Sequence, residues 1–221
     1  MKNQLKLVIF DMDGLMFDTE RINYEAWLEA ATLHQFPIDE KIHTSMIGIR
    51  EKDIPTFLEK IYGKEADITG WQKQVIFNQK EYITKNKTVH KKKGLIELLN
   101  YLESNEIKMA VASSSSTETI EYYLDLEGIR HYFDCVVSGE EVKNGKPAPD
   151  IFLKACESMK VSPENAIVLE DSIHGLKAAR AAKIHNIFIP DRIQVSDELR
   201  EISDVIRDDL SEVIAYIENR E

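Results

Sequence analysis

The chain of 221 residues carries 28 lysines and arginines against 39 aspartates and glutamates, which gives a formal net charge of −11. This balance disfavours nucleic acid and anionic membranes as partners, and no apolar stretch approaches the roughly 18 residues of a membrane-spanning helix. Two cysteines are too few for a disulfide framework, and two aspartates follow the first apolar stretch before a signal-peptide core could form. We therefore expect a cytoplasmic protein.

Short apolar runs rich in β-forming residues predict five buried strands. They cover residues 5–10, 107–112, 134–138, 166–169 and 186–189. Between the later runs lie apolar stripes at helical spacing, around residues 95–102, 120–124, 151–159 and 175–182. Strands and helices that alternate at these lengths predict an α/β fold with a Rossmann-like, doubly wound parallel sheet.

Residues 17–89 break this alternation, because only helical patterns occur there. Asp18 or Thr19 can cap a first helix that stops before Pro37, and further helices are expected at about 38–46, 54–62 and 68–85. Trp27 and Trp71 fall on the apolar stripes and are expected in a helical core. We predict a catalytic core formed by residues 1–16 and 90–221, with a helical cap domain of residues 17–89 inserted after the first strand.

Polar residues follow four of the predicted strands at the point where each ends. They are Asp11 and Asp13 after the first, Ser113, Ser114 and Ser115 after the second, Lys146 in the loop after the third, and Glu170 and Asp171 after the fourth. Each alone is most simply a turn or cap residue. In a doubly wound sheet, however, the carboxyl ends of the strands meet at one rim, where ligands bind. Their joint occurrence there predicts an active site.

Phosphoryl transfer uses this combination of groups. An ionised Asp11 can attack phosphorus and form an aspartyl-phosphate, while Asp13 can protonate the leaving oxygen and later activate water. Ser113 and Lys146 can hold the phosphoryl oxygens. Crowded carboxylates repel one another, and a divalent cation that prefers oxygen ligands, such as Mg²⁺, relieves this repulsion.

Four segments in this order resemble the motifs of the haloacid dehalogenase superfamily: DMDG, VASSS, GKPAPD and VLEDS. The helical insertion after the first motif is similar to the subfamily that contains sugar-phosphate phosphatases and β-phosphoglucomutase. The resemblance implies Asp11 as the nucleophile, Asp13 as the acid/base, and Ser113 with Lys146 as phosphate ligands, Ser114 being a further candidate. It also implies Mg²⁺ held by Asp11, the Asp13 carbonyl and Asp171, with Glu170 in or near the metal shell.

Positions at which this chain differs from the mutases of the subfamily help to distinguish a phosphatase from a mutase. The mutases carry a histidine four residues after the threonine of the first cap helix, and this chain has Asn23 at that position. Asn78 stands where they carry a cap lysine, with Lys80 out of register, whereas Arg50 matches their cap arginine. The resemblance therefore favours a phosphatase of a small phosphorylated metabolite, such as a sugar phosphate, with a β-phosphoglucomutase-like isomerase as the alternative. Arg50 and Asn23 are the candidate cap residues for substrate binding.

Asp13 also disfavours two other functions, dehalogenation and non-catalytic phosphate acceptance. Dehalogenating members of the superfamily do not need a metal and typically lack the residue that Asp13 represents here. A non-catalytic phospho-acceptor module of the receiver type would not need Asp13, the GKP loop or the helical insertion. We expect a monomer whose partner is a small phosphate ester.

The histidines show no metal-ligand spacing. We expect His34, His43, His90, His131 and His185 at the surface or at edges, and His174 at an ordinary helix position.

Overall fold

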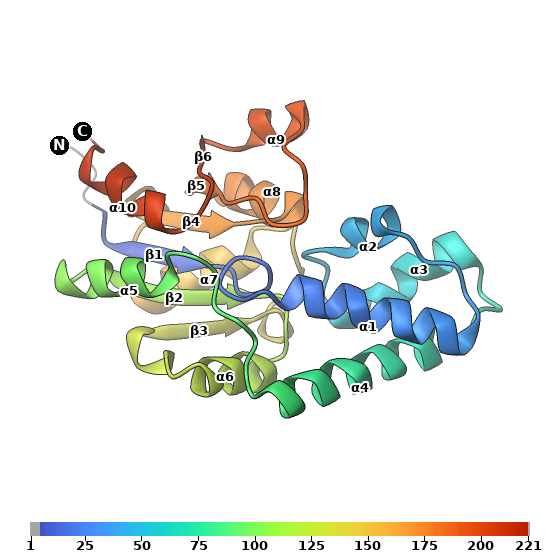
Figure 1. Cartoon of the computed structure of the whole chain (residues 1–221). Helices are drawn as coiled ribbons and strands as arrows, with labels where there is room; N and C mark the ends of the chain where they lie inside the picture. Colours follow the sequence, from blue (N-terminus) through green and yellow to red (C-terminus); the bar gives the residue numbers. More distant parts are fainter. Residues whose placement is uncertain (1–4, 221) are drawn as a thin grey trace.

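The computed structural model describes residues 5–220 and contains a six-stranded sheet in which all neighbouring strands run parallel (Figure 1). The strands are β1 (Leu7–Phe10), β2 (Lys108–Ser113), β3 (Cys135–Ser138), β4 (Ala166–Glu170), β5 (His185–Phe188) and β6 (Val205–Ile206), in the order β3-β2-β1-β4-β5-β6. The five predicted strands are present, with small shifts at their ends. Strand β6 was not predicted, because two residues are too few to show a period.

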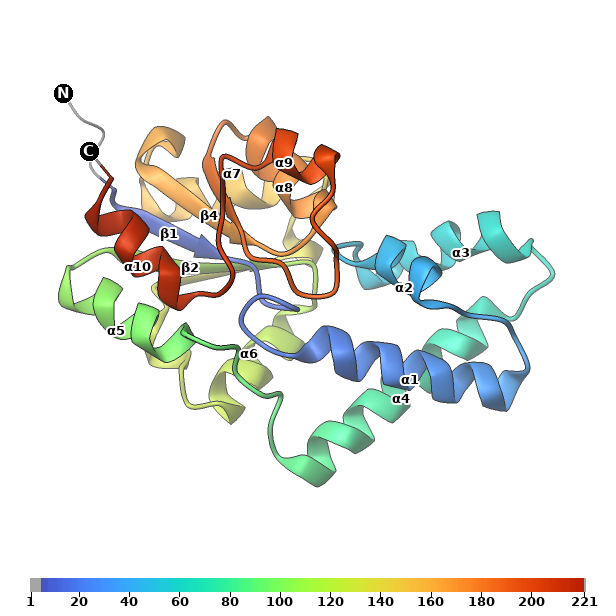
Figure 2. The same cartoon turned by 45° about the horizontal axis from the view of Figure 1, so that its top comes forward.

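Helices cover both faces of the sheet, as the tilted view of Figure 2 shows. On one face pack α5 (Leu95–Ser104), α6 (Thr117–Leu126) and α10 (Ser211–Glu218), and on the other α7 (Asp150–Met159) and α8 (Ile173–Ala181). Helix α9 (Asp197–Ile202) lies near β5 and β6, and short 3-10 turns form η2 (Arg130–Tyr132), η3 (Gly139–Glu141) and η4 (Pro163–Asn165). The predicted Rossmann-like fold is confirmed.

Strand β1 lies at the centre of the sheet and is buried on both faces. Val8 and Phe10 pack with α5 and α6, whereas Leu7 and Ile9 pack with α7 and α8, and none of the four side chains is exposed. A strand buried on both faces needs a continuous apolar run rather than an alternating one. The same burial fixes the register, and so it fixes the position at which the chain emerges from β1 as Asp11.

Between β1 and α5 the chain forms a helical insertion, which we define as residues 19–86. It consists of α1 (Thr19–His34), α2 (Glu40–Met46), η1 (Glu51–Asp53), α3 (Ile54–Tyr62) and α4 (Ile68–Asn86). Trp27 and Trp71 are buried in its own apolar core, as predicted, and Phe36 stacks on Trp71 at a centroid distance of 3.8 Å. Figure 1 shows the insertion beyond the carboxyl ends of the strands.

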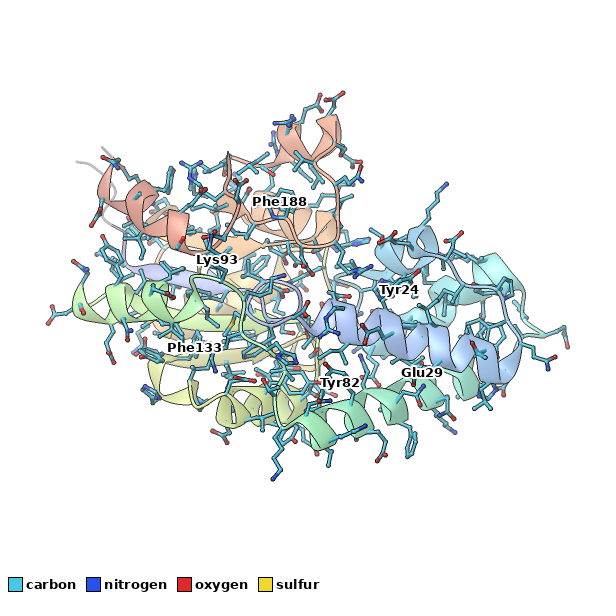
Figure 3. The ribbon with its side chains drawn as sticks, in the orientation of Figure 1. Tyr24, Glu29, Tyr82, Lys93, Phe133 and Phe188 are labelled. Carbon is cyan, nitrogen blue, oxygen red and sulfur yellow. The ribbon has the colours of Figure 1, made fainter. Side chains whose placement is uncertain are left out.

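The two segments that connect the insertion to the sheet lie side by side. The amide of Lys92 donates to the Met16 carbonyl at 2.8 Å, and the amide of Asp18 donates to the His90 carbonyl at 2.9 Å. In the returning segment, Lys93, labelled in Figure 3, pairs with Asp209 at 2.6 Å. The insertion is thus joined to the sheet through one narrow, paired connection. None of the helices formed by residues 5–220 combines the length and apolar character needed to cross a membrane.

Candidate active site

Lys146 lies between two carboxylates at the carboxyl ends of β1 and β4. Its Nζ atom lies 2.6 Å from Oδ1 of Asp11 and 2.6 Å from Oε1 of Glu170, and all three side chains are buried. Burial alone would lower the pKa of Lys146, but the charges of Asp11 and Glu170 outweigh it and raise that pKa. Lys146 therefore stays an ammonium ion and gives the site a fixed positive charge.

Two glycines make room for the buried carboxylates. A Cβ atom on Gly175, in the first turn of α8, would fall on the carboxyl group of Glu170, and a Cβ atom on Gly14 would fall on that of Asp171. Gly14 also has a φ angle of +80°, which side chains with a Cβ atom rarely adopt. The glycine of the DMDG motif is thus required by the carboxylate of a motif about 160 residues away in the sequence.

Asp11, Glu170 and Asp171 form a buried acidic cluster whose nearest oxygen atoms lie within 4.8 Å of one another. Among residues 5–220, neither carboxylate oxygen of Asp171 has a hydrogen-bond partner. Burial raises the pKa of Asp171, and nearby Glu170 and Asp11 add to that rise. Burial also raises the pKa of Asp11 to about 7, with Lys146 opposing and Glu170 adding to the shift. Buried, unpartnered oxygens that repel one another fit a divalent cation with a preference for oxygen ligands.

Asp13 is held by three hydroxyl groups in the position where the pocket opens. Thr19 donates to Oδ1 at 2.8 Å, and Ser113 and Ser115 donate to Oδ2 at 3.2 and 2.8 Å. The sequence predicted that Asp13 and Ser113 lie at one rim of the sheet, and in the structure the two side chains are in contact. The contact of Ser115 with Asp13 was not predicted, although Ser115 follows the same strand end as Ser113.

The carbonyl groups of residues 47 and 48 of the insertion contact the loop after β2 and the first turn of α8. The Ser114 hydroxyl donates to the Gly48 carbonyl at 2.9 Å, so its side chain is turned toward the insertion. Nδ1 of His174 lies 3.0 Å from the Ile47 carbonyl, and this contact makes the imidazole a bridge between α8 and the insertion. His174 lies in α8 and does not line the pocket, as expected. Its contact with Ile47 was not predicted, because nothing in the local sequence reveals a partner 127 residues away.

Arg50 contacts the loop that precedes Lys146. Its Nε atom donates to Asp53 at 2.6 Å, and its Nη1 atom lies 3.4 and 3.3 Å from the carbonyl oxygens of Val142 and Lys143. The structure places Arg50 beside a cavity of about 690 Å³ between the insertion and α6, whereas the pocket that contains Asp11 and Asp13 is lined by the neighbouring Glu51.

The pocket at the strand ends has a volume of about 160 Å³ and lies between the strand ends and the insertion. Asp11, Asp13 and Ser113 line its floor, and Glu20 and Asn23 of α1 line its wall. Lys80 of α4 also lines it, whereas Asn78 instead donates to the Ala26 carbonyl within the insertion. The position expected to be out of register is therefore the one that reaches the pocket.

His43 is buried in the same wall, so the expectation that it lies at the surface was wrong. Only 1% of the residue is exposed, because α2 packs against α1 at this point. Its Nε2 atom lies 2.9 Å from Oδ1 of Asn23 and 3.8 Å from Oε2 of Glu20. Burial, with Arg192 nearby, lowers the pKa of His43 to about 4, and so the imidazole is neutral at neutral pH.

The chain is similar to known proteins over most of its length. The sequence profile of haloacid dehalogenase-like hydrolases matches residues 8–189. The chain is 36% identical to a phosphorylated carbohydrates phosphatase of Thermotoga maritima over 188 residues, which are 83% of this chain and 84% of that protein. It is 32% identical to a fructose-1-phosphate phosphatase of Escherichia coli, over 79% of this chain and 91% of that protein.

A solved structure shares the whole architecture. The β-phosphoglucomutase of Clostridium difficile superposes with a TM-score of 0.80 at 26% identity, covering 98% of both chains. The profile match spans the strand-end residues from Asp11 to Asp171 together with the helical insertion. The chain belongs to the haloacid dehalogenase-like hydrolase family.

Proposed function

We propose that this hydrolase is a Mg²⁺-dependent phosphatase of phosphorylated carbohydrates that works through an aspartyl-phosphate on Asp11. The observation that carries the proposal is the buried contact of Lys146 with Asp11 and Glu170, beside the unpartnered oxygens of Asp171. The names of the phosphatases from T. maritima and E. coli support the substrate class.

Asp11 is the proposed nucleophile, because it lines the pocket floor and its charge is held by Lys146. A carboxylate oxygen of Asp11 forms a bond to phosphorus while the bond from phosphorus to the sugar oxygen breaks. Asp13 gives its proton to that leaving oxygen and later takes one from the water that hydrolyses the aspartyl-phosphate. The hydroxyls of Thr19, Ser113 and Ser115 hold the Asp13 carboxyl in place for both transfers.

The negatively charged oxygens of the phosphoryl group need hydrogen-bond donors. An ammonium group has three donors, and Lys146 uses two of them on Asp11 and Glu170, so a third is available for a phosphoryl oxygen. Ser113 and Ser114 lie at the same rim and are proposed as further phosphate ligands, for which their hydroxyls would turn from Asp13 and from the Gly48 carbonyl to a phosphoryl oxygen. Asp11, the Asp13 carbonyl and Asp171, with Glu170 nearby, would hold Mg²⁺, which supplies positive charge against the developing negative charge on phosphate.

We further propose that residues 17–89 act as a cap domain on a core of residues 1–16 and 90–221, residues 1–4 lying outside the described part of the chain. Its paired connecting segments and its contacts through Ile47 and Gly48 suit a unit that closes over the strand ends. Closure excludes bulk water from a site in which electrostatic interactions must be strong.

Hydrolysis is favoured over isomerisation at this site. Asn23 stands where the mutase pattern has a histidine, and in the structure its amide contacts His43. At this position of α1 the pocket is lined by an amide, which does not ionise, and not by the imidazole of the mutase pattern.

Phosphate release from a panel of sugar phosphates and other monoesters, with and without Mg²⁺, tests the proposal. We expect Mg²⁺-dependent release of phosphate from phosphorylated carbohydrates. Full activity after chelation of the metal would contradict the role of Mg²⁺. Conversion of β-glucose 1-phosphate to glucose 6-phosphate without free phosphate would contradict the phosphatase.

A further inference from the structure

Glu20, Asn23 and His43 form what we call the polar wall of the pocket. It begins next to the reacting groups, because Glu20 follows Thr19, whose hydroxyl is bonded to Asp13. The side chain of Glu20 is 12% exposed, and the His43 side chain is 1% exposed. Tyr24, labelled in Figure 3, closes the wall from outside with its ring 4.9 Å from that of His43.

The hydrogen bond between His43 and Asn23 fixes the direction of the Asn23 amide. A neutral imidazole has one N–H group and one bare nitrogen. Because Nε2 of His43 faces Oδ1 of Asn23 at 2.9 Å, Nε2 carries the proton and Nδ1 is the bare nitrogen. The Asn23 oxygen is therefore occupied by His43, and the Asn23 Nδ2 group forms no hydrogen bond with residues 5–220 and is left for a ligand in the pocket that Asn23 lines.

The wall also holds acceptors that no protein group uses. Nδ1 of His43 is buried and has no partner among the residues that the structure describes. Oε2 of Glu20 lies 3.8 Å from Nε2 of His43, which is too far for a hydrogen bond. A carboxyl group keeps an acceptor oxygen whether or not it is ionised. A buried polar atom without a partner is costly, and Nδ1 of His43 is such an atom. Because Glu20 and Asn23 line the pocket beside it, this wall suits a polar ligand group.

We propose that Asn23 and Glu20 together bind a hydroxyl group of the sugar that carries the phosphate, and that His43 is a positioning residue which aims the Asn23 amide. A hydroxyl accepts one hydrogen bond and donates another, which matches the Nδ2 donor of Asn23 and the acceptor oxygen of Glu20. The hydroxyl lies close to the phosphorylated carbon, because Glu20 adjoins the residue that holds Asp13. This inference rests on the proposed phosphatase activity and adds the basis of its selectivity.

The test compares esters with and without hydroxyl groups. For each variant, kcat/KM is measured on 4-nitrophenyl phosphate, which has no hydroxyl, and on fructose 1-phosphate, glucose 6-phosphate and glycerol 1-phosphate. The quantity compared is the ratio of kcat/KM for the preferred hydroxylated ester to that for the aryl ester. We expect Asn23→Ala and Glu20→Ala each to lower this ratio about tenfold, because each loses one hydrogen bond to the hydroxyl.

His43 is tested by a pair of substitutions. His43→Phe removes the donor that holds the Asn23 oxygen and is expected to lower the ratio, whereas His43→Gln keeps an N–H donor and is expected to restore most of it. A merely structural role of the imidazole would lower turnover of both esters and would leave the ratio unchanged. Equal ratios for the two variants would overturn the positioning role.

Matched controls come from the same helix. Glu29, labelled in Figure 3, and His34 are exposed on α1 away from the pocket, so Glu29→Ala and His34→Phe should leave the ratio unchanged. A wild-type enzyme that hydrolyses the aryl ester and shows no preference for any hydroxylated ester overturns the inference and leaves the phosphatase standing. An enzyme that hydrolyses none of the four esters contradicts the proposed function itself.

Discussion

The strand-end site and the polar wall adjoin at one pocket, but they are built differently. At the strand ends, Lys146 and Asp13 each have protein partners within hydrogen-bonding distance, and the unpartnered oxygens belong to Asp171, where a cation fits. In the polar wall, donors and acceptors outnumber their protein partners.

This difference separates the two tasks of the proposed enzyme. A phosphoryl group is the same in every substrate, so the groups that meet it can be fixed in advance by the sheet. The leaving group varies between substrates, and the residues that meet it lie on a helical insertion joined to the sheet by one paired connection. Variants of the strand-end site should therefore affect all substrates alike, whereas variants of the polar wall should change the preference between substrates.

The largest effect is expected from Asp11→Asn. An amide cannot form the aspartyl-phosphate, so turnover of every ester should fall by about 10⁴-fold or more. Phosphate release and circular dichroism measured on the same sample distinguish lost chemistry from lost folding. Asp209→Asn, which changes a carboxylate near α10, is the matched control. If Asp11→Asn still turned over one ester, the strand-end site would not serve all substrates alike, and the contrast with the polar wall would be wrong.

A smaller loss is expected from Lys146→Met, which removes the central cation and keeps the length of the side chain. We expect kcat/KM to fall roughly 10²–10³-fold on all esters, since a preformed positive charge at the phosphoryl group is lost. Without Lys146 the pKa of Asp11 rises further, so the rising limb of the pH profile should move to higher pH. Lys154→Met, whose ammonium pairs with the more exposed Glu141, is the control. An unchanged pH limb would contradict the charge coupling.

Metal binding should be visible in thermal stability. In the metal-free protein, burial raises the pKa of Asp11 to about 7 and also raises the pKa of Asp171. The folded state then holds more protons than the unfolded chain between about pH 4 and 7, so these groups reduce stability as the pH rises through that window. Mg²⁺ binds the ionised carboxylates, so it should raise Tm more at pH 8 than at pH 5. At a Mg²⁺ concentration of 100 times Kd, the rise in Tm at pH 8 should be roughly 5–10 °C. Equal shifts at both pH values would argue against this cluster as the metal site.

The strand-end site was easier to predict from the sequence than the polar wall. Asp11, Ser113 and Asp171 were predicted because each lies within a residue or two of the end of a buried strand, and the register of a parallel sheet fixes where such residues meet. The helical insertion was also predicted, since its helices show apolar stripes and capping residues. The predicted helix ends lie within about three residues of the observed ones, whereas the short strand β6 was not predicted.

The polar wall could not be predicted in the same way. Whether His43 faces solvent or the pocket depends on how α2 packs on α1, and a single histidine in a short helix has no periodic signal of its own. Asn23 was found only through a comparison with the mutase pattern. Arg50 was found in the same way, and its contacts with the carbonyls of Val142 and Lys143 depend on a loop more than 90 residues away.

His174→Phe should have a moderate effect that sharpens the comparison. The substitution removes the contact between α8 and the Ile47 carbonyl and leaves both regions otherwise intact. A lost hydrogen bond of about 1 kcal/mol corresponds to about a fivefold rise in KM, if closure of the insertion accompanies binding. Because closure serves every ester, KM should rise equally for aryl and sugar phosphates. A changed preference between esters would instead place His174 with the polar wall, and His131→Phe at the exposed surface is the control.

The smallest effect is expected from Glu127→Gln, which tests the paired connection between the helical insertion and the sheet. Its carboxylate accepts hydrogen bonds from the Thr88 hydroxyl at 2.6 Å and the Val89 amide at 2.8 Å, and it pairs with Lys91. Although burial opposes the shift, these partners lower the pKa of Glu127, so its stabilising contribution is present at neutral pH and is lost as the pH falls through that lowered pKa.

We expect Glu127→Gln to lower Tm by about 2–4 °C at pH 7, with the difference narrowing in acid. Glu121→Gln, in helix α6 that directly precedes Glu127, removes a more exposed pair with Arg130 and should change Tm less. The ratio of kcat/KM for hydroxylated and aryl esters should stay constant, because Glu127 holds the returning segment and lines neither side of the pocket. A shift of that ratio would mean that the paired connection, and not only the polar wall, decides which leaving group the pocket accepts.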